Sequence, residues 1–212
     1  MKKKLLWILV ALILTCIVAL CGVFGFDIPL YKFMREFDWR GWEIIGSTFN
    51  VKIWLAISLI LVVIFYVRKL IQTKSKFNIF DMYAKIRGSY AFWVFCSVCS
   101  ASVVGLVIKL LVGRMRPVFY EGLGITGFFP FAMDWAFHSM PSGHTIASFA
   151  GLVMLGLLAP RGRWFAWTLA AIIGISRVCI GAHWPSDVIV GAFVGTATAI
   201  IVKDILARRT NK

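Results

Sequence analysis

Acidic residues and cysteines are scarce in this chain of 212 residues. It holds 9 Asp and Glu against 23 Lys and Arg, and the acids form none of the carboxylate-rich clusters that magnesium sites use. The 5 cysteines are odd in number and lie mostly in apolar stretches, so no disulfide framework is expected. Cys96 and Cys99 have the spacing of half a zinc or redox motif. The sequence has no second pair, so we interpret them as small packing residues.

Alternating polarity, low-complexity linkers and internal repeats are also missing. A membrane β-barrel would need short segments of alternating polarity, so the sequence excludes that architecture. Because no linker or repeat divides the chain, we predict a single integral-membrane domain over residues 1–212.

Apolar residues, in contrast, make up 60% of the chain, whereas a soluble domain usually has about 45–50%. They form long runs, and a run of roughly 18 or more predicts a membrane span. Such spans are helical because lipid leaves no partner for unpaired backbone groups. The sequence therefore predicts an all-α polytopic membrane protein with six transmembrane helices. The six runs lie at about 5–25, 51–67, 89–112, 144–159, 164–182 and 186–202.

The formal net charge of +14 is compatible with binding to nucleic acid or to anionic lipid. Its distribution favours a membrane protein. If the amino terminus is cytoplasmic, most Lys and Arg fall in inner segments, as the positive-inside rule requires. We therefore predict that both termini are cytoplasmic, that the first run is an uncleaved anchor, and that nucleic acid is no partner. The inner segments are 2–4, 68–88, 160–163 and the carboxyl-terminal tail.

Two long segments, 26–50 and 113–143, lie on the predicted outer side of the membrane. Residues 26–50 are rich in aromatics, which is typical of an interfacial helix but also of a lid through which a lipid enters sideways. The 113–143 loop is the longest on that side and rich in Gly and Pro. Long ordered loops at one face are where function tends to lie.

The first of three polar clusters is Lys109, followed seven residues later by Arg116 and Pro117. Proline disfavours helical geometry at the preceding residue, so we expect Arg116 just past a helix end. Arg offers a planar fork to two phosphate oxygens and Lys a point charge. Cations near span ends also snorkel towards headgroups, an alternative that stays open for Lys109 taken alone.

The second cluster is Pro141-Ser142-Gly143-His144, at the start of the fourth run. A helix amino terminus with its unpaired N–H groups is an anion site. Ser142 can cap the helix or donate to a phosphate oxygen, and Gly143 lets the backbone come close. His144 would project from the first turn, where it can protonate a leaving oxygen.

The third cluster holds Ser176-Arg177, His183 and Asp187. Residues four apart are neighbours on one helical face, and Pro185 fits a helix start. A carboxylate on one ring nitrogen of His183 fixes the tautomer and leaves the other nitrogen free to attack. A structural hydrogen bond at a helix start is the alternative for this pair alone.

Taken in order, the clusters at 109–117, 141–144 and 176–187 resemble the three motifs of the type 2 phosphatidic-acid phosphatase superfamily, without substitution at the defining positions. The motifs cover about 109–187, and the six-span layout extends the likeness over most of the chain.

The resemblance implies a role for each matched residue. His183 would be the nucleophile that forms a phosphohistidine, Asp187 would orient it, and His144 would protonate the leaving oxygen and later activate water. The resemblance implies no metal and no cofactor. The residues expected to bind phosphate are Lys109, Arg116, Ser142, Gly143 and Arg177.

Two further residues are candidate headgroup contacts. Arg114 stands beside the first cluster and can contact a second phosphate or headgroup, or remain a solvated loop cation. His138 precedes the second cluster and can act in the site or make a loop hydrogen bond.

The expected function is therefore that of a membrane lipid phosphatase, whose partners are the bilayer and a lipid phosphate. Substrates within the resembled family are undecaprenyl pyrophosphate, phosphatidylglycerol phosphate, phosphatidic acid and lipid A 1-phosphate. Small size and short loops favour a bacterial inner membrane, with the site facing the periplasm. A lipid phosphotransferase is the alternative, and a non-catalytic lipid-binding protein is the alternative from another class.

Arg116→Lys should impair turnover, because a point charge cannot replace a bidentate fork on phosphate. We expect kcat/KM for a lipid phosphate to fall by more than about tenfold, the worth of one charge-assisted hydrogen bond. Steady-state kinetics in detergent measure this, and near-normal values would reduce Arg116 to a structural role.

Overall fold

The computed structural model of the chain describes residues 2–37, 39–73, 82 and 85–210. Part of the predicted inner segment, including Lys74 and Lys76, lies outside these residues. Over the described residues all regular structure is helical, apart from one isolated antiparallel bridge between Arg114 and Phe128.

Each of the six predicted runs contains a helix. The helices are α1 (Lys2–Cys21), α4 (Val51–Thr73), α6 (Tyr90–Val112), α8 (Gly143–Leu158), α9 (Arg163–Cys179) and α10 (Pro185–Thr210). The prediction of an all-α membrane protein is confirmed. Within the described residues, four segments are long and apolar enough to cross a membrane: Lys3–Arg35, α4, α6 and α10. Four of the six predicted spans therefore coincide with candidate spans, while the six-span layout and its orientation stay predictions.

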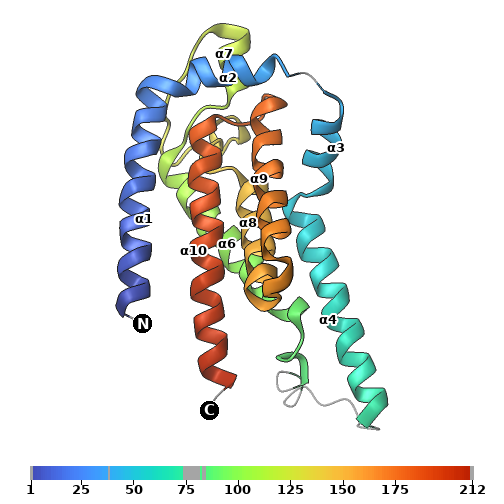
Figure 1. The fold of residues 1–212 in the computed structure, drawn as a ribbon. Helices are drawn as coiled ribbons and strands as arrows, with labels where there is room; N and C mark the ends of the chain where they lie inside the picture. The colour runs from blue at the N-terminus through green and yellow to red at the C-terminus, as the bar shows by residue number, and fades with distance from the viewer. Residues whose placement is uncertain (1, 38, 74–81, 83–84, 211–212) are drawn as a thin grey trace.

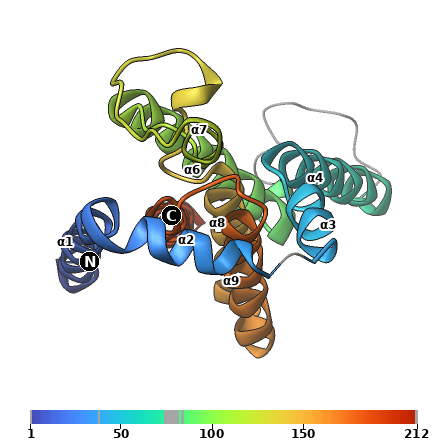
Figure 2. The same ribbon diagram turned by 90° about the horizontal axis from the view of Figure 1, so that it is seen from above.

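The two remaining helices are shorter than expected for spans, at 16 residues in α8 and 17 in α9. For α8, the packing shows the reason. Helix α8 lies in the middle of the bundle against α6, α9 and α10 (Figure 1, Figure 2). Most of its surface is covered by protein, including the fully buried Ala147, Ala150 and Met154. A helix enclosed by others does not need to match the full apolar thickness of a bilayer.

The outer side of the bundle is apolar, as a lipid-facing surface requires. Leu5, Trp7 and Leu14 of α1 are more than half exposed, and the exposed face of α4 carries Ile57 and Ile60. The buried core, in contrast, contains many small residues, which let helices approach closely when lipid is the solvent. A Cβ on Gly195 of α10, for example, would meet the Ile146 carbonyl oxygen of α8 at 2.6 Å.

The aromatic segment 26–50 forms two short helices rather than an open loop. Helix α1 passes through a π-helical turn, Gly22–Phe26, into α2 (Asp27–Arg35), and α3 (Gly41–Thr48) follows. Figures 1 and 2 show α2 lying across the end of the bundle, over α9 and α10. It turns Asp27 and Tyr31 inward.

The segment 113–143, which its Gly and Pro content predicts to be a loop, also contains helical structure. Helix α7 (Pro117–Leu123) and a 3-10 turn (Trp135–Phe137) lie within it. The signal for α7 was present, because Pro117 occupies the first helical position, where a missing N–H costs nothing.

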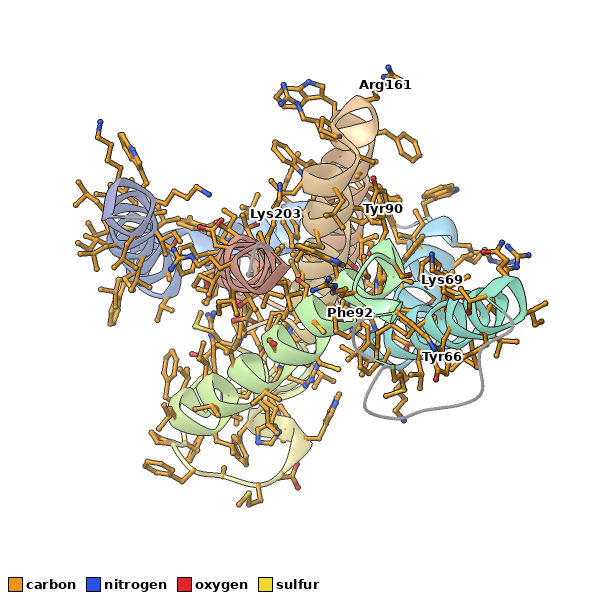
Figure 3. All side chains as sticks on the ribbon, turned by 90° about the horizontal axis from the view of Figure 1, so that it is seen from below. Tyr66, Lys69, Tyr90, Phe92, Arg161 and Lys203 are labelled. Carbon is orange, nitrogen blue, oxygen red and sulfur yellow. The ribbon has the colours of Figure 1, made fainter. Side chains whose placement is uncertain are left out.

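The start of α1 and the end of α10 lie at the opposite end of the bundle from α2 and α7 (Figure 1). Figure 3 views that end and labels Lys69, Arg161 and Lys203, three of the cations predicted to be cytoplasmic. Lys203 donates a hydrogen bond of 2.8 Å to the Leu157 carbonyl oxygen. These three cations therefore lie at the end of the bundle opposite to α2 and α7.

Gly113→Ala should destabilise the fold, since Gly113 ends α6 with φ +59° and a Cβ there would overlap the Phe129 carbonyl group. We expect a loss of about 3 kcal/mol in the free energy of unfolding. Gly124 is the matched control: its φ is +69°, but no atom would lie within 4 Å of its Cβ. Gly124→Ala should cost about 1 kcal/mol. Thermal unfolding in detergent compares the two, and equal losses would contradict the packing argument.

Candidate active site

The polar motif residues meet at the end of the bundle that carries α2 and α7. A pocket of about 350 Å³ is lined there by residues of all three clusters. Two more predicted site residues, Ser142 and Asp187, lie behind the pocket wall and are fully buried. The structure thus brings together the eight residues expected to act. The motif residues that line the pocket are Lys109, Arg116, Gly143, His144, Arg177 and His183.

Lys109 occupies the last turn of α6, and its Nζ donates a hydrogen bond of 2.7 Å to the His138 carbonyl oxygen. The same oxygen accepts from Arg116 Nη2 at 3.2 Å. The His138 ring does something else: its Nε2 is 2.9 Å from the Ala132 carbonyl oxygen, within the loop. His138 therefore holds two cations through its backbone, a role that no side-chain pattern reveals.

Arg116 lies just past the end of α6 in extended geometry, at φ −76° and ψ 155°, as the proline after it predicts. Its guanidinium stacks on the Trp135 ring at 4.2 Å and donates to the Trp135 carbonyl oxygen at 3.1 Å. A further bond of 3.2 Å reaches the Ala182 carbonyl oxygen beside His183. Burial lowers the pKa of Arg116 to about 10, so it stays cationic at neutral pH.

Arg177 ends α9 and contributes the third cation. Its carbonyl oxygen accepts the N–H groups of Ala182 and His183, which ties the loop that carries His183 to the helix. Its buried Nε has no hydrogen-bond partner among the described residues, so this donor is available to an anion in the pocket. Gly46 of α3 lies against the guanidinium so closely that a Cβ there would collide with Nη1.

Helix α8 points its amino terminus at the pocket. Ser142 occupies the N-cap position, but its side chain makes no capping hydrogen bond to the helix. Gly143 begins the helix. The unpaired N–H groups and the helix dipole therefore favour an anion at this position. Ser142 accepts a hydrogen bond of 3.0 Å from Thr145 Oγ1, and its own N–H donates to the Asp187 carbonyl oxygen at 3.0 Å. The second cluster is thereby tied to the third.

His183 and Asp187 are adjacent, but not in the way that a shared helical face predicts. α10 begins at Pro185, so His183 lies in the loop before it. Its Nδ1 is 3.6 Å from Asp187 Oδ2, longer than a hydrogen bond. That oxygen accepts instead from Ser139 Oγ at 2.5 Å and Trp184 N at 2.9 Å. Catalytic hydrogen bonds are often long without substrate and tighten when it binds.

His183 is almost fully enclosed, with 3% of its side chain exposed. Burial lowers the pKa of His183 well below its ordinary value, and the opposing effect of Asp187 is smaller. The imidazole is therefore neutral at physiological pH, the form in which a ring nitrogen has a lone pair to attack phosphorus.

Arg114 is neither a solvated loop cation nor placed to meet a headgroup, and that expectation is wrong. Only 7% of its side chain is exposed. Its Nη2 is 2.7 Å from Asp27 Oδ2, while Nη1 donates to Asp187 Oδ1 at 2.8 Å and to Ser186 Oγ at 2.7 Å. The side chain turns inward because two buried carboxylates require a cation between them.

Sequence reasoning missed three residues that shape this site: Asp27, Gly46 and Ser139. Each acts only through contact with a residue far away in the chain. A signal existed for Asp27, since an ionisable residue at the end of an apolar run is a functional candidate. The sequence contains no such signal for Gly46 or Ser139.

Fold and site together define a class: a helical membrane protein with a cationic pocket that holds two histidines at one end of the bundle. The model of the PAP2 superfamily matches residues 90–211, which include all three clusters. The chain belongs to this superfamily.

Similarity to individual proteins supports the chain's membership of the superfamily. A lipid A 1-phosphatase from Rhizobium johnstonii is 34% identical over 129 residues, 59% of this chain and 53% of the relative. An undecaprenyl-diphosphatase from Sulfolobus acidocaldarius is 34% identical over 98 residues, 45% of each protein. The chain thus spans about half the length of the curated relatives it matches.

Among solved structures, the first transmembrane PAP2 type phosphatidylglycerolphosphate phosphatase from Bacillus subtilis superposes with a TM-score of 0.61. The alignment covers 98% of both chains at 20% identity, which shows a shared fold.

Gly46→Ala should weaken phosphate binding with little effect on stability, because the new Cβ displaces only the flexible end of Arg177. We expect kcat/KM to fall roughly 10- to 100-fold, the worth of a charge-assisted contact to phosphate. Gly122→Ala is the matched control, since Gly122 also lies inside a short helix and no atom would lie within 4 Å of its Cβ. Steady-state kinetics and thermal unfolding separate the effects, and unchanged kinetics for Gly46→Ala would contradict the proposed contact.

Proposed function

We propose that this protein is a metal-independent lipid phosphate phosphatase that works through a phosphohistidine on His183. The observation that supports this most strongly is the single pocket in which His183 and His144 meet three cations. This pocket already holds the groups needed to bind a phosphoryl group, attack it and release the product.

The cations would act on the phosphoryl group. Charge spreads over its three equatorial oxygens in the transition state, and Lys109, Arg116 and Arg177 converge where those oxygens would lie. Donors fixed in advance stabilise such charge without reorganising. The N–H groups at the start of α8 add to this cradle.

The histidines would divide the chemistry. The pocket-side nitrogen of neutral His183 attacks phosphorus, and the bond from phosphorus to the lipid oxygen breaks. Protonated His144 gives its proton to that oxygen, so the lipid leaves as an alcohol or a shorter phosphate. Neutral His144 then takes a proton from water, which attacks the phosphohistidine and frees phosphate and His183. Asp187 stabilises the positive charge on the His183 ring throughout.

The substrate would be a phosphorylated membrane lipid. Val51, Val118 and Trp135 form an apolar part of the pocket wall, suited to the first carbons of a lipid chain. The names of the relatives support lipid A 1-phosphate and undecaprenyl pyrophosphate as the first candidates. Phosphatidylglycerol phosphate and phosphatidic acid complete the set.

We further propose that the pocket faces the outer side of a bacterial inner membrane. Lys69, Arg161 and Lys203 lie at the opposite end of the bundle, the end at which α1 begins and α10 ends. Basic residues favour the cytoplasmic side, which leaves the pocket on the periplasmic side.

The decisive experiment is phosphate release by purified protein in detergent with EDTA, across these four lipids, for wild type, His183→Ala and His144→Ala. Release by the wild type should resist EDTA. His183→Ala should reduce kcat by more than about a thousandfold, and His144→Ala by about 100- to 10,000-fold. Size-exclusion profiles like that of the wild type verify folding.

Wild-type-like turnover by either histidine variant would overturn the mechanism. If phosphate is released only when a lipid acceptor is added, and is found on that acceptor, the protein is a phosphotransferase with the same nucleophile.

A further inference from the structure

A buried charge network lies behind the active site and involves residues outside the three motifs. Arg114 sits between Asp27, at the start of α2, and Asp187, at the start of α10, at distances of 2.7 and 2.8 Å. Ser186 Oγ donates to Asp27 Oδ2 at 2.6 Å, and its backbone N–H donates to Asp27 Oδ1 at 2.9 Å. All four residues are more than nine-tenths buried.

The proposed mechanism assigns no role to Asp27 or Arg114. Neither lines the pocket, where Lys109, Arg116 and Arg177 already supply the positive charge. Of the eight motif residues, the one that their side chains bond is Asp187, through Arg114. We therefore look for their contribution at that carboxylate.

The network determines how the Asp187 carboxylate is turned. Arg114 holds Oδ1, while Ser139 and the Trp184 N–H hold Oδ2, the oxygen nearest to His183. Arg114 is itself held by Asp27 and by the Trp184 ring, 5.3 Å from its guanidinium. A carboxylate bound on both oxygens cannot rotate away from the ring that it orients.

The network also sets the net charge next to His183. One guanidinium shared by two carboxylates leaves the group of three with one net negative charge. A buried Arg114 paired with Asp187 alone would be neutral overall, and less negative potential would reach His183. Asp27 therefore preserves the negative charge that stabilises the positive ring of the intermediate.

The backbone around Asp27 is shaped for this contact. A Cβ on Gly22 would lie 2.8 Å from Ser186 Cβ and 3.1 Å from Asp27 Oδ1, so glycine allows the α1–α2 corner to reach the start of α10. The corner is a π-helical turn, Gly22–Phe26, and such turns occur often at functional sites. Figure 1 shows this corner at the pocket end of the bundle.

We propose that Asp27 and Arg114 are positioning residues for catalysis, which fix the orientation and the charge of Asp187. The amino-terminal α1–α2 corner is then part of the catalytic apparatus, although it precedes the segment matched by the family model. This inference rests on the proposed function of His183 and Asp187.

The test compares Asp27→Asn, Arg114→Gln and the double variant by steady-state kinetics on the best lipid substrate. Each single change should lower kcat by about a hundredfold, as expected for a misplaced catalytic group. KM and competitive inhibition by inorganic phosphate should stay within about twofold, because the three phosphate-binding cations are untouched. The double variant should lose no more than about a hundredfold, since residues acting as a unit are not additive.

Glu121→Gln is the matched control. Glu121 of α7 also anchors α2, through Tyr31 at 2.6 Å and Arg35 at 2.9 Å, but it does not touch Asp187. Its kcat should remain near that of the wild type. An equal loss of kcat in Glu121→Gln would mean that any loosening of α2 impairs the enzyme, and would overturn the proposal.

Ser186→Ala keeps the test valid if the charge variants fail to fold. It removes only the hydroxyl shared by Asp27 and Arg114, and should lower kcat by about tenfold at unchanged KM. Normal kcat in Ser186→Ala and in folded charge variants would overturn the positioning role while leaving the proposed function intact. Multiplied losses of about ten thousandfold in the double variant would also contradict a shared role. An inactive wild type would overturn the proposed function and this inference with it.

Discussion

The charge on one buried carboxylate, Asp187, is the constraint on which this end of the molecule depends. An ionised group with no solvent exposure is tolerated only where donors surround it. Its donors Arg114, Ser139 and Trp184 come from three separate segments of the chain, and Asp27 holds the first of them. The hydrogen bonds and ion pairs that the Asp187 carboxylate requires thus join α2, the segments before and after α7, and the start of α10.

The membrane explains why the site lies at helix ends. Backbone and charged groups cannot be left unpaired in lipid, so polar chemistry gathers where helices stop and loops can supply carbonyl oxygens. Lys109 and Arg177 occupy last turns, while His144 occupies a first turn. Central α8 can be short because other helices enclose it, and its amino terminus adds a dipole to the pocket.

Local patterns predicted much of this well. Apolar runs located all six principal helices, Pro117 and Pro185 marked two helix starts, and three clusters identified the pocket cations and histidines. These features depend on residues close in sequence. The prediction was wrong for Arg114, and His183 lies before α10 rather than on its face. In both cases the outcome depended on partners that spacing cannot reveal.

The sequence by itself determined the class of protein, the helical spans and the chemical groups of the site, because hydrophobic length and residue type are local properties. Only the tertiary structure decided which cation lines the pocket and which pairs with buried carboxylates. Arg114 and Arg116 are two residues apart, yet one is enclosed by Asp27 and Asp187 and the other lines the pocket. Burial and partnership arise from segments distant in the chain, and those are settled only when the helices pack.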